Sequence, residues 1–93
     1  MLELQDSSLF REQAFISGRW VDADTERRLD VGNPATGKRI GSVPDMGREE
    51  VARAIDAAEA AFFMWREETA KARANFLRRW HDLMMENRED LAR

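Results

Sequence analysis

His81 is the first side chain in this 93-residue sequence that could carry out chemistry, because it is the only histidine. The chain has no cysteine, so a thiol nucleophile and a thiolate zinc site are both excluded. A catalytic base needs a partner that orients it, and Asp82 is expected to lie on a different face of the same helix. We therefore predict that His81 is an ordinary side chain at the border of an apolar stripe.

Two adjacent acidic pairs, Glu49-Glu50 and Glu67-Glu68, are candidates for acid–base chemistry. Such chemistry requires two carboxyl groups that converge on one cleft, whereas these pairs fall at the predicted ends of helices. Charge at a solvated helix end is the favoured interpretation. The glycines have neither the dinucleotide-binding nor the P-loop spacing, and Gly37-Lys38 matches only the end of a P-loop.

Nucleic acid and membranes are not predicted partners. Arg78-Arg79 beside Trp80 could suggest a nucleic-acid-binding helix, but acidic residues on the same helix nearly cancel the charge. The whole chain carries 15 basic and 18 acidic residues, a net charge of −3. No apolar run approaches the length of a membrane span, and the first residues do not resemble a secretory signal. We expect a cytoplasmic protein.

The sequence divides into three segments, an arm over residues 1–12, a β-rich segment over 13–46 and a helical segment over 47–93. Apolar pairs on both sides of Ser17-Gly18 predict a tight hairpin, because glycine accepts a positive φ. A second strand pair is predicted around the turn-forming sequence from Asn33 to Gly37.

The period of the apolar residues changes after Gly47, which predicts a helix from about Arg48 to Glu67. Within it, Glu49 and Arg53 have the spacing of an intrahelical ion pair. Thr69 is the predicted N-cap of a second helix, and the short connection predicts that the two helices pack as an antiparallel pair. The expected apolar stripes consist of Val51, Ile55, Ala58, Phe62 and Trp65 on the first helix, and Phe76, Leu77, Trp80, Leu83, Met84 and Leu91 on the second.

The predicted fold class is an α+β fragment of an α/β protein, with a β-hairpin and paired strands followed by two packed antiparallel helices. Phe63, Met64 and Met85 lie outside the stripes, and no helix stop signal precedes Arg93. We therefore expect the partner to be the remainder of a parent chain or another copy of the fragment, in a homo-oligomer. A stand-alone interaction module that uses the three off-stripe residues is the alternative.

The order of several short motifs resembles the beginning of the aldehyde dehydrogenase superfamily. Within it, the match is closer to the bacterial succinate-semialdehyde dehydrogenases, and glutarate-semialdehyde dehydrogenases share these features. The resemblance spans essentially the whole chain. It depends on residues 15–20 (FISGRW), 33–37 (NPATG) and 41–47 (GSVPDMG), and for the closer match on 6–11 (DSSLFR), 54–58 (AIDAA), 83–86 (LMME) and 90–93 (DLAR).

The resemblance implies a parent enzyme that oxidises a small carboxylated aldehyde with NAD or NADP. In that family a cysteine thiolate attacks the aldehyde and a glutamate activates water, and both come from later sequence, as does the glycine-rich cofactor turn. No catalytic, cofactor-binding or metal-binding residue is therefore assigned here, and the fragment alone is expected to be inactive. Family members often bind a structural cation through carbonyls that match Val31 and Gly32, where a plain turn is the favoured interpretation. The implied role of this region is scaffolding of the cofactor-binding domain, to which residues 47–93 would belong.

Overall fold

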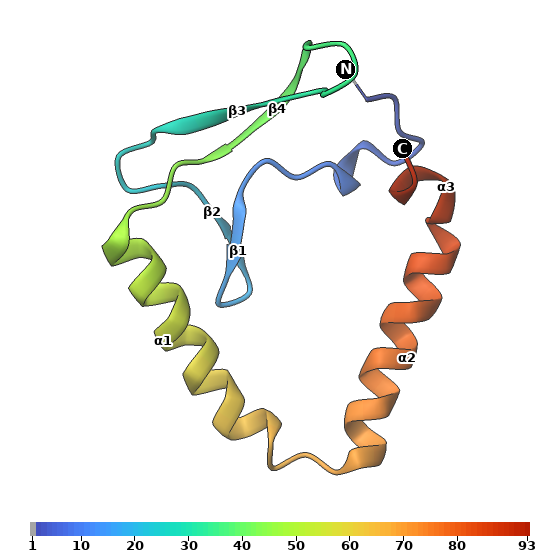
Figure 1. The fold of residues 1–93 in the computed structure, drawn as a ribbon. Helices are drawn as coiled ribbons and strands as arrows, with labels where there is room; N and C mark the ends of the chain where they lie inside the picture. Colours follow the sequence, from blue (N-terminus) through green and yellow to red (C-terminus); the bar gives the residue numbers. More distant parts are fainter. Residues whose placement is uncertain (1) are drawn as a thin grey trace.

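The computed structural model describes residues 2–93, which form two antiparallel strand pairs followed by helices (Figure 1). The strand pairs are separate two-stranded sheets, β1–β2 and β3–β4. Two antiparallel strand pairs followed by helices agree with the predicted fold class. The elements are the 3₁₀ turn η1 (Ser7–Leu9), β1 (Ala14–Ile16), β2 (Arg19–Val21), β3 (Arg28–Gly32), β4 (Arg39–Pro44), α1 (Arg48–Trp65), α2 (Ala70–Glu86) and α3 (Arg88–Leu91).

The first strand pair is the tight hairpin that the sequence predicts. Ser17 and Gly18 form its turn with φ values of 53° and 76°. Positive φ at both central positions gives a turn whose twist matches that of the flanking strands. Directly opposite each other across the pair, Phe15 and Trp20 bring their ring centroids to 4.9 Å, and the Arg11 guanidinium lies 4.9 Å from the Trp20 ring centroid.

The second strand pair also follows the prediction. Asn33 shapes its turn, because the Asn33 side chain accepts a hydrogen bond from the Ala35 amide at 2.8 Å. The Asn33 carbonyl accepts another from the Gly37 amide at 2.7 Å, and Gly37 has a φ of 74°. The register of the pair shifts between Val31 and Gly32, just before this turn.

The second helix begins where the sequence predicts and ends earlier than its stripe suggests. The Thr69 hydroxyl accepts from the Ala72 amide at 3.0 Å, so Thr69 is the N-cap. Asn87 interrupts the helix, since its side chain donates to the Leu83 carbonyl at 2.9 Å. The four-residue helix α3 follows, so Leu91 is not part of one continuous helix with Leu83.

The prediction that the two long helices pack as an antiparallel pair is wrong. They diverge from the connection at residues 66–69 like the two sides of a V (Figure 1). Their aromatic contact is close to this connection, where the Trp65 and Phe76 ring centroids lie 5.8 Å apart. A short connection brings two helix ends together, but it does not fix the angle between the helices. Neither apolar stripe covers the other.

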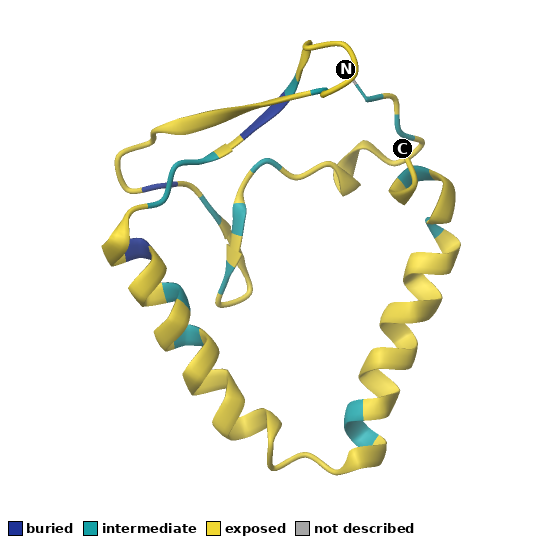
Figure 2. Ribbon diagram, in the orientation of Figure 1, coloured by how far each residue is buried: buried dark blue, intermediate teal, exposed yellow. Residues whose placement is uncertain are grey.

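The described residues form almost no hydrophobic core (Figure 2). Ala23 is the one apolar side chain among residues 2–93 that is buried, at 4% exposure, and no large side chain there is fully buried. The radius of gyration is 16.5 Å, whereas about 12 Å is typical of a compact domain of this length. The fold is therefore an open framework of locally formed elements.

Candidate functional site

His81 makes one side-chain contact, with the neighbouring Asp82. The distance from His81 Nδ1 to Asp82 Oδ1 is 3.3 Å, so these adjacent side chains reach each other along the helix surface. Both side chains are about two-thirds exposed, at 67% and 65%. A solvated pair on the outside of a helix has no cleft in which a substrate could meet it. The geometry supports the prediction that His81 is an ordinary surface side chain.

Glu50 is the one residue of the two acidic pairs that is buried, which the sequence analysis did not predict. It is buried, with 8% exposure, while Glu49, Glu67 and Glu68 are exposed. Glu50 Oε1 accepts from the Gly47 amide at 2.8 Å, and Oε2 accepts from the Asp24 amide at 2.8 Å. The Glu50 carboxylate thus provides an acceptor for the N-cap amide of α1, and it also joins the loop after β2 to this helix. The acidic pairs do not converge on a cleft.

Arg53 also joins this loop to α1, instead of pairing with Glu49 as predicted. Its Nη2 donates to both carboxylate oxygens of Asp24, at 2.8 and 2.7 Å. The hydrogen bonds to Asp24, and then its negative charge, raise the pKa of Arg53. Asp24 is therefore held twice by α1: its amide donates to Glu50, and its carboxylate accepts from Arg53.

Arg28 is the centre of a second polar cluster, which joins the amino-terminal arm to β4. Its Nε donates to the Ser42 hydroxyl at 2.7 Å, and its Nη1 donates to Asp22 at 2.9 Å. Its Nη2 donates to the carbonyls of Glu12 and Ser42. Four of the five N–H donors of Arg28 thus bind groups of this chain, so this guanidinium has a structural role.

The candidate cation site stays a prediction. Val31 and Gly32 lie at the end of β3, next to the register shift, and Val31 is exposed. No group of three or more histidine or acidic side chains with the spacing of a metal site occurs within residues 2–93. The two carbonyls would need further ligands from outside the described segment.

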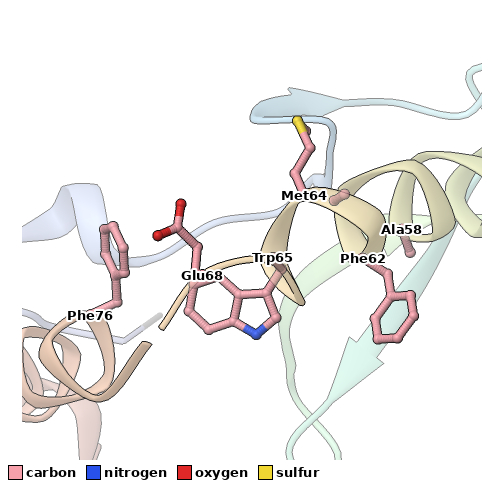
Figure 3. A pocket seen from close by; sticks show the side chains of 7 residues that line it. Ala58, Phe62, Met64, Trp65, Glu68 and Phe76 are labelled. Carbon is pink, nitrogen blue, oxygen red and sulfur yellow. The ribbon is translucent and has the colours of Figure 1, made fainter. Parts of the chain in front are cut away.

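An apolar surface groove is formed by the carboxyl-terminal part of α1 and by Phe76 of α2. This open groove of about 640 Å³ lies where α1 meets the connection to α2. Figure 3 shows the aromatic side chains of Phe62, Trp65 and Phe76 along it, together with the carboxylate of Glu68. The predicted stripe residues are as exposed as the off-stripe ones: Ile55 is 61% exposed and Phe63 is 47% exposed. A separate partner surface made of Phe63, Met64 and Met85 therefore finds no support.

The amount of uncovered surface is large for a protein of this size. The chain exposes 8102 Å², whereas a folded monomer of 10.8 kDa exposes about 5,500 Å². The excess of about 2,600 Å² exceeds the roughly 800 Å² that one partner contributes to a standard protein–protein interface. Such an excess is the size of an obligate interface. We call the exposed apolar side chains of α1 and α2, which contribute to this excess, the helix face: Val51, Ile55, Phe62, Phe63, Met64, Trp65, Phe76, Leu77, Trp80, Leu83, Met84 and Met85.

The model of the aldehyde dehydrogenase family matches residues 20–93. The chain belongs to the aldehyde dehydrogenase family. The glutarate-semialdehyde dehydrogenase of Pseudomonas aeruginosa is 59% identical over 92 residues. The NADP(+)-dependent succinate-semialdehyde dehydrogenase of Escherichia coli is 54% identical over 92 residues. Each alignment covers 99% of this chain but 19% of the relative, so the chain spans about a fifth of the length of these curated relatives.

Solved structures of aldehyde dehydrogenases contain the same arrangement of elements. A crystal structure of an NADP-dependent enzyme from E. coli matches 97% of this chain and 19% of its own, with a TM-score of 0.93 and 54% identity. The succinate-semialdehyde dehydrogenase of Burkholderia pseudomallei matches 96% of this chain and 18% of its own, with a TM-score of 0.90 and 53% identity. The V of the two helices is thus part of the aldehyde dehydrogenase fold.

Neither the groove beside Trp65 nor the cluster at Arg28 has the features of a dinucleotide site. Such a site needs backbone N–H groups or cations that receive a pyrophosphate, usually at a glycine-rich turn. The groove beside Trp65 is lined by apolar side chains and Glu68, whose charge repels phosphate. At Arg28, four of the five N–H donors already bind groups of this chain. None of the helices in residues 2–93 has the length and apolar character that crossing a membrane requires.

Proposed function

We propose that this chain is the amino-terminal structural segment of an NAD(P)-dependent semialdehyde dehydrogenase that oxidises succinate or glutarate semialdehyde to the dicarboxylic acid. The segment supplies scaffold, and the rest of the parent chain supplies the chemistry. The observation that carries the proposal is the uncovered helix face on an otherwise well-formed set of elements. The chain has no cysteine, so the thiolate nucleophile of the proposed reaction would come from the rest of the parent chain.

The helix face fits polypeptide better than it fits a small molecule. Side chains such as Ile55 and Trp80 are each 61% exposed although they occupy the centres of the two stripes. Burying one large apolar side chain contributes roughly 1.5–3 kcal/mol, so covering this face stabilises the segment substantially. A small ligand would cover a small part of it. Missing chain from the same protein would cover all of it.

The proposed substrate of the parent enzyme is inferred from the names of the relatives. The glutarate-semialdehyde dehydrogenase of P. aeruginosa and the succinate-semialdehyde dehydrogenase of E. coli each align with 99% of the chain, at 59% and 54% identity. A 3-sulfolactaldehyde dehydrogenase of Pseudomonas putida is 54% identical as well. All three substrates are short aldehydes with an anionic group at the far end. We therefore expect the substrate of the parent enzyme to be a small anionic aldehyde, and a dicarboxylic semialdehyde in particular.

A chimera tests the proposal directly. Residues 1–93 replace the matching segment of the P. aeruginosa glutarate-semialdehyde dehydrogenase, and NAD(P) reduction is measured with succinate and glutarate semialdehydes. We expect turnover close to that of the parent relative. A soluble, correctly assembled chimera without turnover would contradict the proposal.

Three controls make the chimera informative. The relative without its first 92 residues should be insoluble or inactive, because its side of the interface is uncovered. Co-expression of residues 1–93 with that truncated relative should restore soluble protein. The isolated 93-residue chain should reduce no NAD(P) with either aldehyde and should self-associate through the helix face. Turnover by the pure isolated chain, or a monomer that stays stable at high concentration, would count against the assignment.

A further inference from the structure

The amino-terminal arm touches both ends of the framework. At one end, Asp90 in α3 accepts two backbone hydrogen bonds, from the Gln5 amide at 2.8 Å and the Asp6 amide at 2.9 Å. These partners are 85 and 84 residues apart in sequence. Figure 1 shows the resulting arrangement, in which the amino-terminal arm passes beside α3. A carboxylate that receives two N–H donors makes charge-assisted hydrogen bonds, which are stronger than neutral ones.

The other end of the arm is fixed to the second sheet. Glu12 Oε2 accepts from the Ser42 amide at 2.8 Å, and Arg28 holds the Glu12 carbonyl. The arm lies so close to β4 that a Cβ on Gly41 would be 2.9 Å from Cζ of Phe10. Residues 5–12 thus run from α3 to β4 with specific contacts at both ends, and we call them the strap.

The strap has a mechanical role because the two long helices do not pack along their length. Within residues 2–93, the hydrogen bonds that join α2 or α3 to anything before residue 66 are the two at Asp90. The ring contact of Trp65 and Phe76 lies near the connection, where it does not determine how far the helices open. The two hydrogen bonds at Asp90 therefore lie at the open end of the V, far from the connection between the helices.

We propose that the strap locks α3 to the β3–β4 sheet and thereby fixes the opening between α1 and α2. The lock is a property of these 93 residues alone. Its purpose rests on the proposed function: an opening of fixed width presents the helix face to the rest of the parent chain in one geometry. Asp90 is then a positioning residue, since it contacts only backbone of the strap.

Substitution of Asp90 tests the lock in the full-length protein that contains this chain. Asp90→Ala removes both acceptor oxygens, and we expect hydrogen–deuterium exchange of the Gln5 and Asp6 amides to become roughly tenfold faster or more. Asp90→Asn retains one acceptor oxygen and should give an intermediate rate. Asp82→Ala is the matched control, because Asp82 is an exposed aspartate that contacts His81 instead of the strap.

The outcomes separate the lock from the proposed function. Faster exchange confined to residues 5–12 in Asp90→Ala, with α1 unchanged, supports the lock. Unchanged exchange at Gln5 and Asp6 overturns it, and so does equal acceleration by Asp82→Ala. The assignment as a dehydrogenase segment is judged separately by turnover of the chimera, which can fail while the exchange result stands.

Discussion

Asp24 and Arg53 face each other across the joint between the first hairpin and α1, and both carboxylate oxygens of Asp24 accept from Arg53 Nη2. Each side chain is more than half exposed, so solvent screens this ion pair. The neighbouring carboxylate of Glu50 is buried and accepts two backbone hydrogen bonds. Because an unsatisfied buried donor is costly, Glu50 contributes more to the joint than the visible ion pair does.

The first prediction concerns this joint. Glu50→Ala leaves the amides of Asp24 and Gly47 without an acceptor and should destabilise the joint by about 1–3 kcal/mol. Glu49→Ala, one residue away and exposed, is the control and should change stability by less than about 0.5 kcal/mol. Hydrogen exchange of the two amides in the full-length protein measures the effect. Equal effects of the two substitutions would contradict this account of Glu50.

The second prediction concerns the crossing of the strap over β4. In Gly41→Ala the new Cβ would meet Phe10 Cζ at 2.9 Å and Glu12 Oε2 at 3.1 Å, so the strap must move. We expect a loss of about 1 kcal/mol, since the tip of Phe10 can shift. Gly32→Ala is the control, with its nearest atom at 3.9 Å. Thermal unfolding compares them, and a neutral Gly41→Ala would show that the crossing is loose.

The third prediction concerns the helix face. Trp80 is 61% exposed in this chain, yet Trp80→Ala in the full-length protein should cost about 3–5 kcal/mol, as for a core aromatic residue. Glu86→Ala on the same helix should stay within about 0.5 kcal/mol. Thermal unfolding of the assembled protein distinguishes the two. A surface-like effect of Trp80→Ala would mean that no polypeptide covers this part of the face.

The fourth prediction concerns acid. The Asp6 carboxylate caps η1 by accepting from the Ser8 hydroxyl and amide, and these hydrogen bonds lower the pKa of Asp6 below its usual 3.8. A lowered pKa means that the cap is fully present above pH 3.8 and is lost as the pH falls through the folded value. The Ser8 amide resonance should therefore shift below pH 3.8. A transition near neutral pH would contradict the assignment.

The fifth prediction concerns His81. His81→Gln should leave kcat/KM of the chimera unchanged within about twofold, because the side chain is exposed and reaches only Asp82. The measurement is NAD(P) reduction by the chimera and by its variant across pH 6–8. Disappearance of one limb of the pH–rate profile in the variant would restore His81 as a catalytic candidate.

Local chemistry made most of the elements predictable. The Ser17-Gly18 turn, the Asn33 turn and the Thr69 cap each depend on residues that lie within four positions of one another. The apolar period identified both long helices for the same reason. The interruption at Asn87 could have been recognised, since asparagine often ends a helix, but its side chain sits inside an apparently continuous stripe.

Contacts between distant residues could not be predicted. A hydrophobic period shows that a helix has an apolar side without showing what covers it, so antiparallel packing was inferred from loop length alone. Arg53 pairs with Asp24, 29 positions away, in preference to the nearby Glu49. The strap contacts of Asp90 and the cluster around Arg28 likewise join segments that no sequence spacing relates. The buried Glu50 had a local signal, a glutamate three residues after the first cap position, that the interpretation as a solvated charge overlooked.

The very small hydrophobic core of residues 2–93 has a consequence for synthesis. Ribosomes release the amino terminus first, and under the proposed function some four-fifths of the protein is still to be made when Arg93 emerges. Translation proceeds at about 5–20 residues per second, so the apolar side chains of α1 and α2 stay exposed for tens of seconds before the later chain can bury them. During that interval the nascent segment is a natural client for chaperones, and the yield of the finished enzyme should depend on how well they shield it.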